Sequence, residues 1–160
     1  IVTGIGMAFG YWICNVWRLY KAKAYRNESI TIMEITTPIS AGELLDKITI
    51  LKIKSEKLSD AVKLKNVQTE LDALNAVASA AFDYDDGLTK LVDGLQDING
   101  QLWVIEDDIR DCERAGDFGD EFIRLARAVY VTNDVRAKLK KDINILLGSA
   151  LVEEKSYQEY

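Results

Sequence analysis

Two long segments of the chain carry apolar residues at alternating intervals of three and four, the spacing of a helix that presents one apolar stripe to a partner helix. The first stripe consists of Leu88, Leu91, Leu95, Ile98, Leu102, Ile105, Ile109 and Cys112. The second consists of Phe122, Leu125, Val129, Thr132, Arg136, Leu139, Ile143 and Leu146. Between them, Gly116 is typical of a helix end and Asp117 of a helix start. The pattern therefore predicts two long helices joined by a short turn.

A short turn forces these two helices to run antiparallel, and the stripes then match position by position. Counted outward from the turn, Leu95 faces Leu139 and Leu88 faces Leu146. No offset has to be introduced to align the two stripes. We therefore predict a helical hairpin in which Cys112 is a small core residue.

Two shorter helices are predicted before this hairpin. Ser40 begins the first, and Glu43 completes the S-x-x-E pattern of a capping box. Its apolar face is wide enough to touch more than one neighbour. Ser59 or Asp60 caps the second helix, and the polar residues of 82–87 predict a loop after it. The fold expected is all-α: an antiparallel four-helix, coiled-coil-like bundle built from two helical hairpins.

Residues 33–160 are expected to form this bundle domain, and residues 1–32 are set apart from it by composition. Residues 1–17 carry no charge and are followed by a basic cluster, as at the cytoplasmic end of a transmembrane helix. At about 1.5 Å per residue they span only about 26 Å, less than a bilayer core of about 30 Å. Three interpretations remain open: a non-core extension that ends before Met33, a membrane-anchor-like segment, and a helix packed on the domain. Contact with a membrane is expected only through residues 1–26.

Composition excludes several classes of function. The chain of 160 residues has 20 Lys plus Arg against 26 Asp plus Glu, so a net charge of −6 argues against nucleic acid as a partner. It contains no His, which removes Ser-His and Cys-His catalysis and most zinc sites. Its two Cys cannot form a disulfide framework or a four-cysteine metal site. Since no phosphate-binding loop or serine elbow is present either, we expect no metal, no cofactor and no catalytic residue.

The second stripe is polar at two adjacent positions, Thr132 and Arg136, with Asn133 beside them. The first helix places Asp46 and Lys47 next to its apolar face, and the third helix carries Glu106. These six residues, Asp46, Lys47, Glu106, Thr132, Asn133 and Arg136, are the candidate ligand-binding residues.

The same residues allow a structural and a ligand-binding interpretation. In the structural one, Arg136 pairs with Asp97, with Glu106 or with a carboxylate of the first helix, and fixes the register of the bundle. Lys47 then pairs with Glu43, and Glu106 with Arg110. In the ligand-binding one, Arg136 and Lys47 bind an anion, Thr132 and Asn133 orient it, and Glu106 or Asp46 acts as acid or base.

Several runs of the chain resemble a family of small bacterial proteins known as domain of unknown function 6165. The most specific are PISAGELLDKITILKIK at 38–54 and LWVIEDDIRDCERAGDFGDEFIRLARAVYVTNDVRAKLKKDIN at 102–144. The similarity extends over about residues 36–157. It implies a start of the family domain near Met33 and a setting near cell-surface polysaccharide synthesis, without an established activity.

The absence of any catalytic motif favours a non-enzymatic interaction or accessory module over an enzyme. Its expected partner is another protein or a second copy, and its expected location is the cytoplasm, with tethering to the inner membrane through residues 1–26 as a variant. The alternative is a small enzyme or anionic-ligand binder that uses the polar layer inside the bundle.

Overall fold

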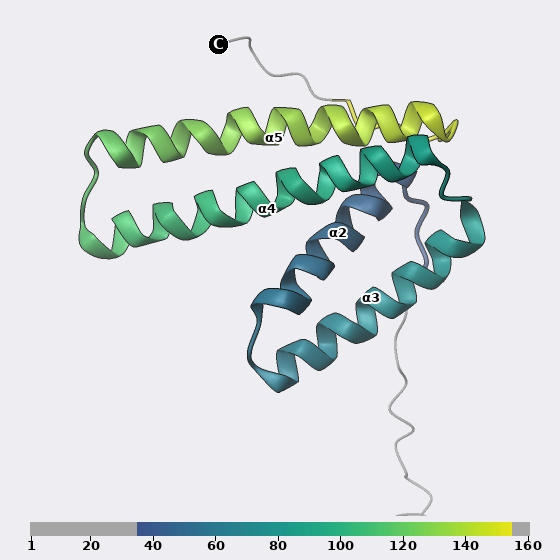
Figure 1. Ribbon diagram of the computed structural model, residues 1–160, viewed down its shortest axis with the longest axis horizontal. Helices are drawn as coiled ribbons and strands as arrows, with labels where there is room; N and C mark the ends of the chain where they lie inside the picture. The colour runs from purple at the N-terminus through teal and green to yellow at the C-terminus, as the bar shows by residue number, and fades with distance from the viewer. Residues whose placement is uncertain (1–34, 155–160) are drawn as a thin grey trace, which may run out of the picture. The chain divides into compact units, whose positions relative to one another are not determined.

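The computed structural model describes residues 35–154, and this part of the chain contains four α-helices and no β-strand (Figure 1). The helices are α2 (Ala41–Lys57), α3 (Ala61–Ala81), α4 (Asp86–Ala115) and α5 (Asp120–Leu146). They form two hairpins, α2–α3 and α4–α5, packed into a helical bundle. The prediction of an all-α bundle built from two hairpins is therefore confirmed.

The chain divides into two units, residues 1–37 and 38–160. Of the first unit, only residues 35–37 are described, and they form no regular secondary structure. The apolar N-terminal segment, for which a helix and a membrane anchor were among the interpretations, thus lies outside the described residues. None of the helices within residues 35–154 is long and apolar enough to cross a membrane.

Side-chain caps fix where three of the helices begin. Ser40 Oγ accepts a hydrogen bond from the Glu43 N–H, as predicted, and Asp60 caps α3 with its carboxylate. Asp85 caps α4, which begins at Asp86. The loop predicted at 82–87 therefore ends two residues earlier than expected. The Glu43 carboxylate binds Lys140 of α5, so it serves a tertiary contact in addition to its place in the first turn of α2.

The turn between α4 and α5 lies where the sequence predicts it. Gly116 has a φ of 66°, the left-handed conformation that glycine adopts without steric cost, and ends α4. The next helix begins at Asp120 and not at Asp117. Asp117 Oδ1 accepts a hydrogen bond from the Gly119 N–H and so shapes the turn before α5.

The register of the α4–α5 hairpin agrees with the predicted pairing to within one residue. A methyl group placed on Gly94 would lie 3.6 Å from Leu139 Cδ2, and one placed on Gly87 would lie 3.8 Å from Leu146 Cδ2. The sequence pairs Leu139 with Leu95 and Leu146 with Leu88, each one position after the glycine that it contacts in the structure. The two helices therefore run antiparallel from their common turn.

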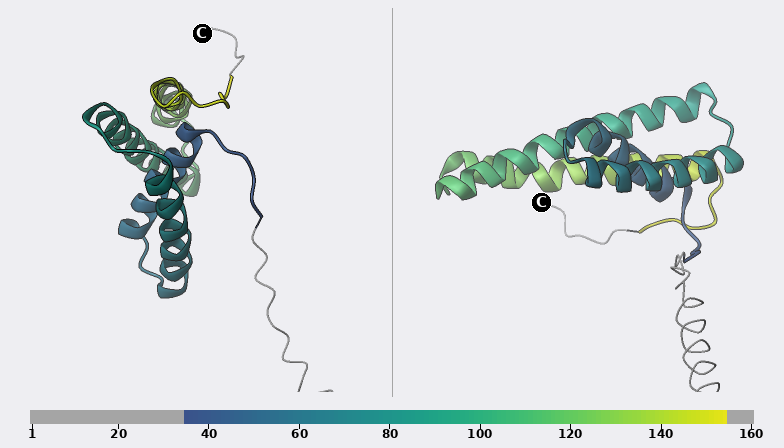
Figure 2. Two further views of the ribbon diagram at one scale, coloured as in Figure 1. Left: turned by 90° about the vertical axis from the view of Figure 1, so that its right-hand side faces the viewer. Right: turned by 90° about the horizontal axis from the view of Figure 1, so that it is seen from below.

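Helix α2 is the centre of the bundle, because it packs against α3, α4 and α5. Its wide apolar face is buried as predicted and meets residues of all three neighbours in one core. The largest fully buried apolar side chains of this core are Leu45, Ile48, Leu88, Leu95 and Ile143. The α2–α3 hairpin crosses the α4–α5 hairpin obliquely, so the four helices are not all aligned (Figures 1 and 2).

Because the α2–α3 hairpin packs on the longer hairpin through α2, away from the turn at Gly116, the end with this turn projects as two helices (Figure 1). We call residues 104–131 of this projection the arm. Leu125 is the one buried apolar side chain within the arm, and Cys112, predicted to be a core residue, is only half-buried. Two helices alone cannot enclose the stripe between them, which explains this difference.

Candidate functional site

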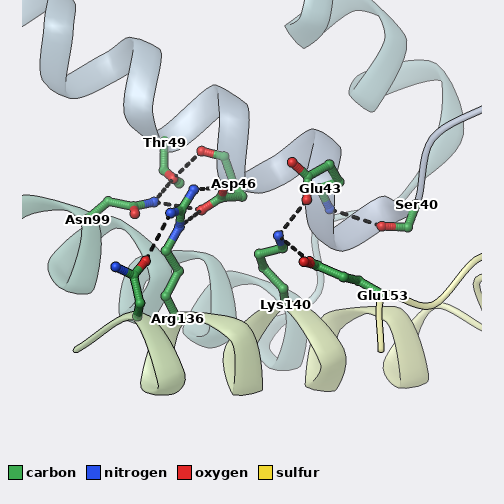
Figure 3. A network of polar contacts seen from close by, with 9 residues as sticks. Ser40, Glu43, Asp46, Thr49, Asn99, Arg136, Lys140 and Glu153 are labelled. Atoms are coloured by element: carbon green, nitrogen blue, oxygen red, sulfur yellow. Dashed lines mark hydrogen bonds and ion pairs between the residues drawn. The ribbon is translucent and has the colours of Figure 1, made fainter. Parts of the chain in front are cut away.

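The polar layer of the bundle is built around Asp46, whose side chain is almost completely buried between α2 and α5 (Figure 3). Arg136 donates to both of its oxygens, from Nε to Oδ1 at 2.8 Å and from Nη2 to Oδ2 at 2.5 Å. The pairing is bidentate, the geometry in which arginine binds a carboxylate most specifically. The structure thus confirms that Arg136 pairs with a carboxylate of the first helix.

Helix α4 completes the coordination of Asp46. Asn99 donates from Nδ2 to Asp46 Oδ1 and to Thr49 Oγ1, both at 2.9 Å. Thr49 in turn donates to the Asp46 backbone carbonyl at 2.8 Å. Both Asn99 and Thr49 are buried, so three helices share one hydrogen-bonded network inside the bundle.

The hydrogen bonds to Asp46 raise the pKa of the Arg136 guanidinium, against the lowering effect of its partial burial. Asn133 adds a weaker contact, because its Oδ1 accepts from Arg136 Nη1 at 3.3 Å. Arg136 therefore remains charged at every physiological pH, and its charge is balanced inside the protein.

A second polar cluster lies one turn further along α5. Lys140 is buried and binds Glu43 of α2 at 2.5 Å and Glu153 of the C-terminal segment at 2.6 Å (Figure 3). Burial acts to lower the pKa of Lys140, but the hydrogen bonds to Glu153 and Glu43 outweigh it and raise the pKa. The cluster therefore holds the start of α2 and the segment after α5 against the same lysine.

The start of α2 also approaches the α5 backbone directly. The Gly42 N–H donates to Asn144 Oδ1 at 2.7 Å. A methyl group on Gly42 would overlap the Lys140 carbonyl oxygen, so only glycine allows this contact. Gly42 and Asn144 are both buried, and the contact fixes the position at which α2 crosses α5.

Beside the Asp46 network, a hollow of about 480 Å³ opens to solvent between α2, α4 and α5. Its apolar lining consists of Ile50, Ile53, Leu102 and Trp103. Its polar lining consists of Asn99, Glu106, Asp107, Arg110, Asn133 and Arg136. We refer to it as the hollow. Its volume lies within the range of sites for small molecules or for single side chains of a partner.

The structure brings together four of the six residues that the sequence singled out. Asp46, Asn133 and Arg136 form one network, and Glu106 lines the hollow next to it. Glu106 binds Arg110 at 2.8 Å, the i,i+4 pair that the structural interpretation predicts.

The other two predicted residues are not part of this site. Lys47 binds Glu70 of α3 at 2.5 Å, and not Glu43 as predicted, because the Glu43 carboxylate is turned toward Lys140. Thr132 is half-buried on α5 and does not belong to the lining of the hollow. Lys47 and Arg136 thus belong to separate ion pairs, with Glu70 and with Asp46.

Sequence reasoning missed the buried polar residues Thr49, Asn99, Lys140 and Asn144 as members of a network. A signal was present for two of them. Lys140 and Asn144 follow Arg136 at intervals of four, so one polar stripe runs along α5 toward its C-terminus. Within residues 35–154, no group of three or more Cys, Asp and Glu side chains is placed to hold a metal ion.

Comparison with known proteins places the chain in one family. The model of the Family of unknown function (DUF6165) matches residues 33–160. No curated protein and no solved structure matches the chain. Since the match extends over most of the chain and includes all four helices, this protein belongs to the Family of unknown function (DUF6165).

Proposed function

We propose that the protein is a non-enzymatic interaction module that associates with a second copy of itself through the arm. The observation that carries this proposal is the set of large apolar side chains left exposed there. Five residues of the arm belong to it: Val104, Phe118, Ile123, Tyr130 and Val131. Exposed apolar side chains on a projecting element are available to protein–protein contacts.

A second copy suits this surface for a geometric reason. Each arm is half of an antiparallel four-helix bundle, and two arms related by a twofold axis would complete one. The ion pairs of the arm, for example Glu121 with Arg124 and Glu106 with Arg110, are each formed within a single helix. They do not involve the exposed apolar residues. Association would bury those residues and enclose the half-buried stripe between α4 and α5.

The test compares two residues of equal exposure. Ile123 of the arm is 53% exposed and Val77 of α3 is 52% exposed. We expect the native chain to be dimeric by light scattering coupled to size exclusion. Ile123→Gln should shift it toward the monomer with unchanged helix content, whereas Val77→Gln should leave the dimer intact.

A native chain that stays monomeric at every concentration would refute self-association. A dimer that survives Ile123→Gln and dissociates with Val77→Gln would place the interface on α3. The accessory role in cell-envelope polysaccharide synthesis and the cytoplasmic location, with or without a tether through residues 1–26, are part of the proposal and are supported by the sequence resemblance and composition. Fractionation of cells that express the chain with and without residues 1–32 tests the tether.

A further inference from the structure

The hollow beside Asp46 carries more negative than positive charge once its internal ion pairs are counted. Arg136 is balanced by Asp46, and Arg110 is balanced by Glu106. Asp107 also lines the hollow and forms no ion pair with another described residue. The Asp107 carboxylate is therefore available to a ligand that enters the hollow.

The buried amide of Asn99 adds an acceptor to the same space. Asn99 is 5% exposed and lines the hollow, and its nitrogen is used for Asp46 and Thr49 (Figure 3). Its oxygen accepts no hydrogen bond from a described residue. An amide oxygen that lines the hollow can accept a hydrogen bond from a ligand that brings an N–H donor.

Trp103 supplies an aromatic surface at the same place. It precedes Asp107 by four residues on α4, so the two side chains are neighbours on one helix face, and both line the hollow. The face of an indole ring attracts cations, and the exposed Asp107 carboxylate adds a negative charge beside it.

We propose that the hollow binds an organic cation with N–H donors, a guanidinium or alkylammonium group. The Asp107 carboxylate and the Asn99 oxygen receive its donors, Trp103 contacts its charged face, and its apolar stem lies on Ile50 and Ile53. This ligand class is opposite in charge to the anion that the sequence suggests, because the structure balances both arginines of the hollow internally. Glu106, Asp107 and Arg110 belong to both the hollow and the arm, but binding of this ligand requires no second copy of the chain.

The experiment titrates the full chain with ethylguanidinium and follows the indole N–H signals by NMR. Trp103→Phe identifies the Trp103 signal among those of the three tryptophans of the chain. We expect this signal to shift in a saturable manner. Sodium propionate, the anionic probe of similar size, should leave it in place.

The matched variants are Asp107→Asn and Asp108→Asn, which remove the same charge from neighbouring positions. Asp108 does not line the hollow. We expect Asp107→Asn to weaken binding about fivefold, the effect of losing one partly exposed ion pair, and Asp108→Asn to leave it unchanged. Equal losses in both variants would reduce the effect to the net charge of the protein and overturn the proposal. So would a Trp103 signal that responds to propionate or does not respond to ethylguanidinium.

A blocked tripeptide, glycine-arginine-glycine, separates the two sources of such a cation. Tighter binding of the tripeptide than of ethylguanidinium assigns the hollow to an arginine of a partner chain. Equal or weaker binding assigns it to a free small cation. A site that binds neither probe would contradict both.

Discussion

Asp46 and Arg136, 90 residues apart in the sequence, form a bidentate ion pair between α2 and α5. The Asp46 side chain is 2% exposed, whereas the Arg136 side chain is 26% exposed and borders the hollow. The pair therefore joins the interior of the bundle to its solvent-facing side. Its loss should affect stability more than any surface ion pair would.

Replacing Asp46 by Asn should destabilise the fold by about 3 kcal/mol, because the Arg136 charge would stay partly buried without a counter-ion. Urea unfolding followed by circular dichroism measures this change. The double variant Asp46→Leu with Arg136→Met should recover a large part of the loss, since it leaves no unpaired charge. Asp97→Asn, at an exposed position of α4, serves as the control and should have little effect. Equal stabilities of the Asp46 and Asp97 variants would contradict a central role for the pair.

Replacing Gly42 and Gly100 by alanine should change the stability of the protein in opposite directions. Gly42→Ala should destabilise the protein by about 1–3 kcal/mol, because the added methyl group overlaps the Lys140 carbonyl and α2 must move. Gly100→Ala should stabilise it by about 1 kcal/mol, because nothing lies within 4 Å of the new methyl group and alanine favours the helix. Thermal unfolding of the two variants distinguishes these effects. A neutral Gly42→Ala would show that α2 does not touch α5 there.

Lys140 should make the fold sensitive to high pH. Its pKa is raised above the ordinary value of 10.5 in the folded protein, so the contribution of its ion pairs is fully present below pH 10.5. That contribution is lost as the pH rises through the higher pKa of the folded state. Urea unfolding between about pH 9 and 12 should show a decline that is smaller in Lys140→Met, after comparison with the exposed control Lys65→Met. Parallel curves for the native chain and Lys140→Met would rule out the raised pKa.

Leu125→Ala should loosen the arm more than the rest of the bundle. Leu125 is 2% exposed and is the buried apolar residue of the arm, so truncation should cost about 2–4 kcal/mol there. Hydrogen exchange should quicken in residues 104–131 and change little in α2 and α3. Val104→Ala, at an exposed position of the same arm, provides the comparison. Uniform quickening along the chain would mean that the arm unfolds only together with the core.

The helices and the α4–α5 hairpin could be predicted because their signals are local and repeated. The apolar spacing from Leu88 to Leu146 determines two helices, and Gly116 determines the turn between them. The sequence predicts that α5 begins at Asp117, three residues before its start at Asp120. An aspartate can accept a backbone hydrogen bond in a turn as well as at the start of a helix, and Asp117 does so in the turn. Such a choice depends on backbone geometry that the sequence does not reveal.

The site was predicted only in part, because the sequence indicates which polar residues are unusual but not which residues they bind. Arg136 and Asp46 stood out because each interrupts an apolar pattern. That Asp46 and Arg136 bind each other follows from the crossing of α2 over α5. Lys47 binds Glu70 within the α2–α3 hairpin, and the sequence spacing does not show that pairing. Lys140 was missed because a lysine near the end of a helix is usually a surface residue, whereas here the start of α2 and the segment that carries Glu153 both contact it.

Together, the two ion pairs between α2 and α5 determine how far α2 can shift along α5. Glu43 and Asp46 meet Lys140 and Arg136 in antiparallel order. A slip by one helical turn, about 5.4 Å, in one direction would bring Asp46 to Lys140 and strand Arg136. A slip in the other direction would bring Glu43 to Arg136 and leave Lys140 with Glu153 alone. Each displaced alignment loses one of the two ion pairs between α2 and α5, so the crossing has a single favourable position.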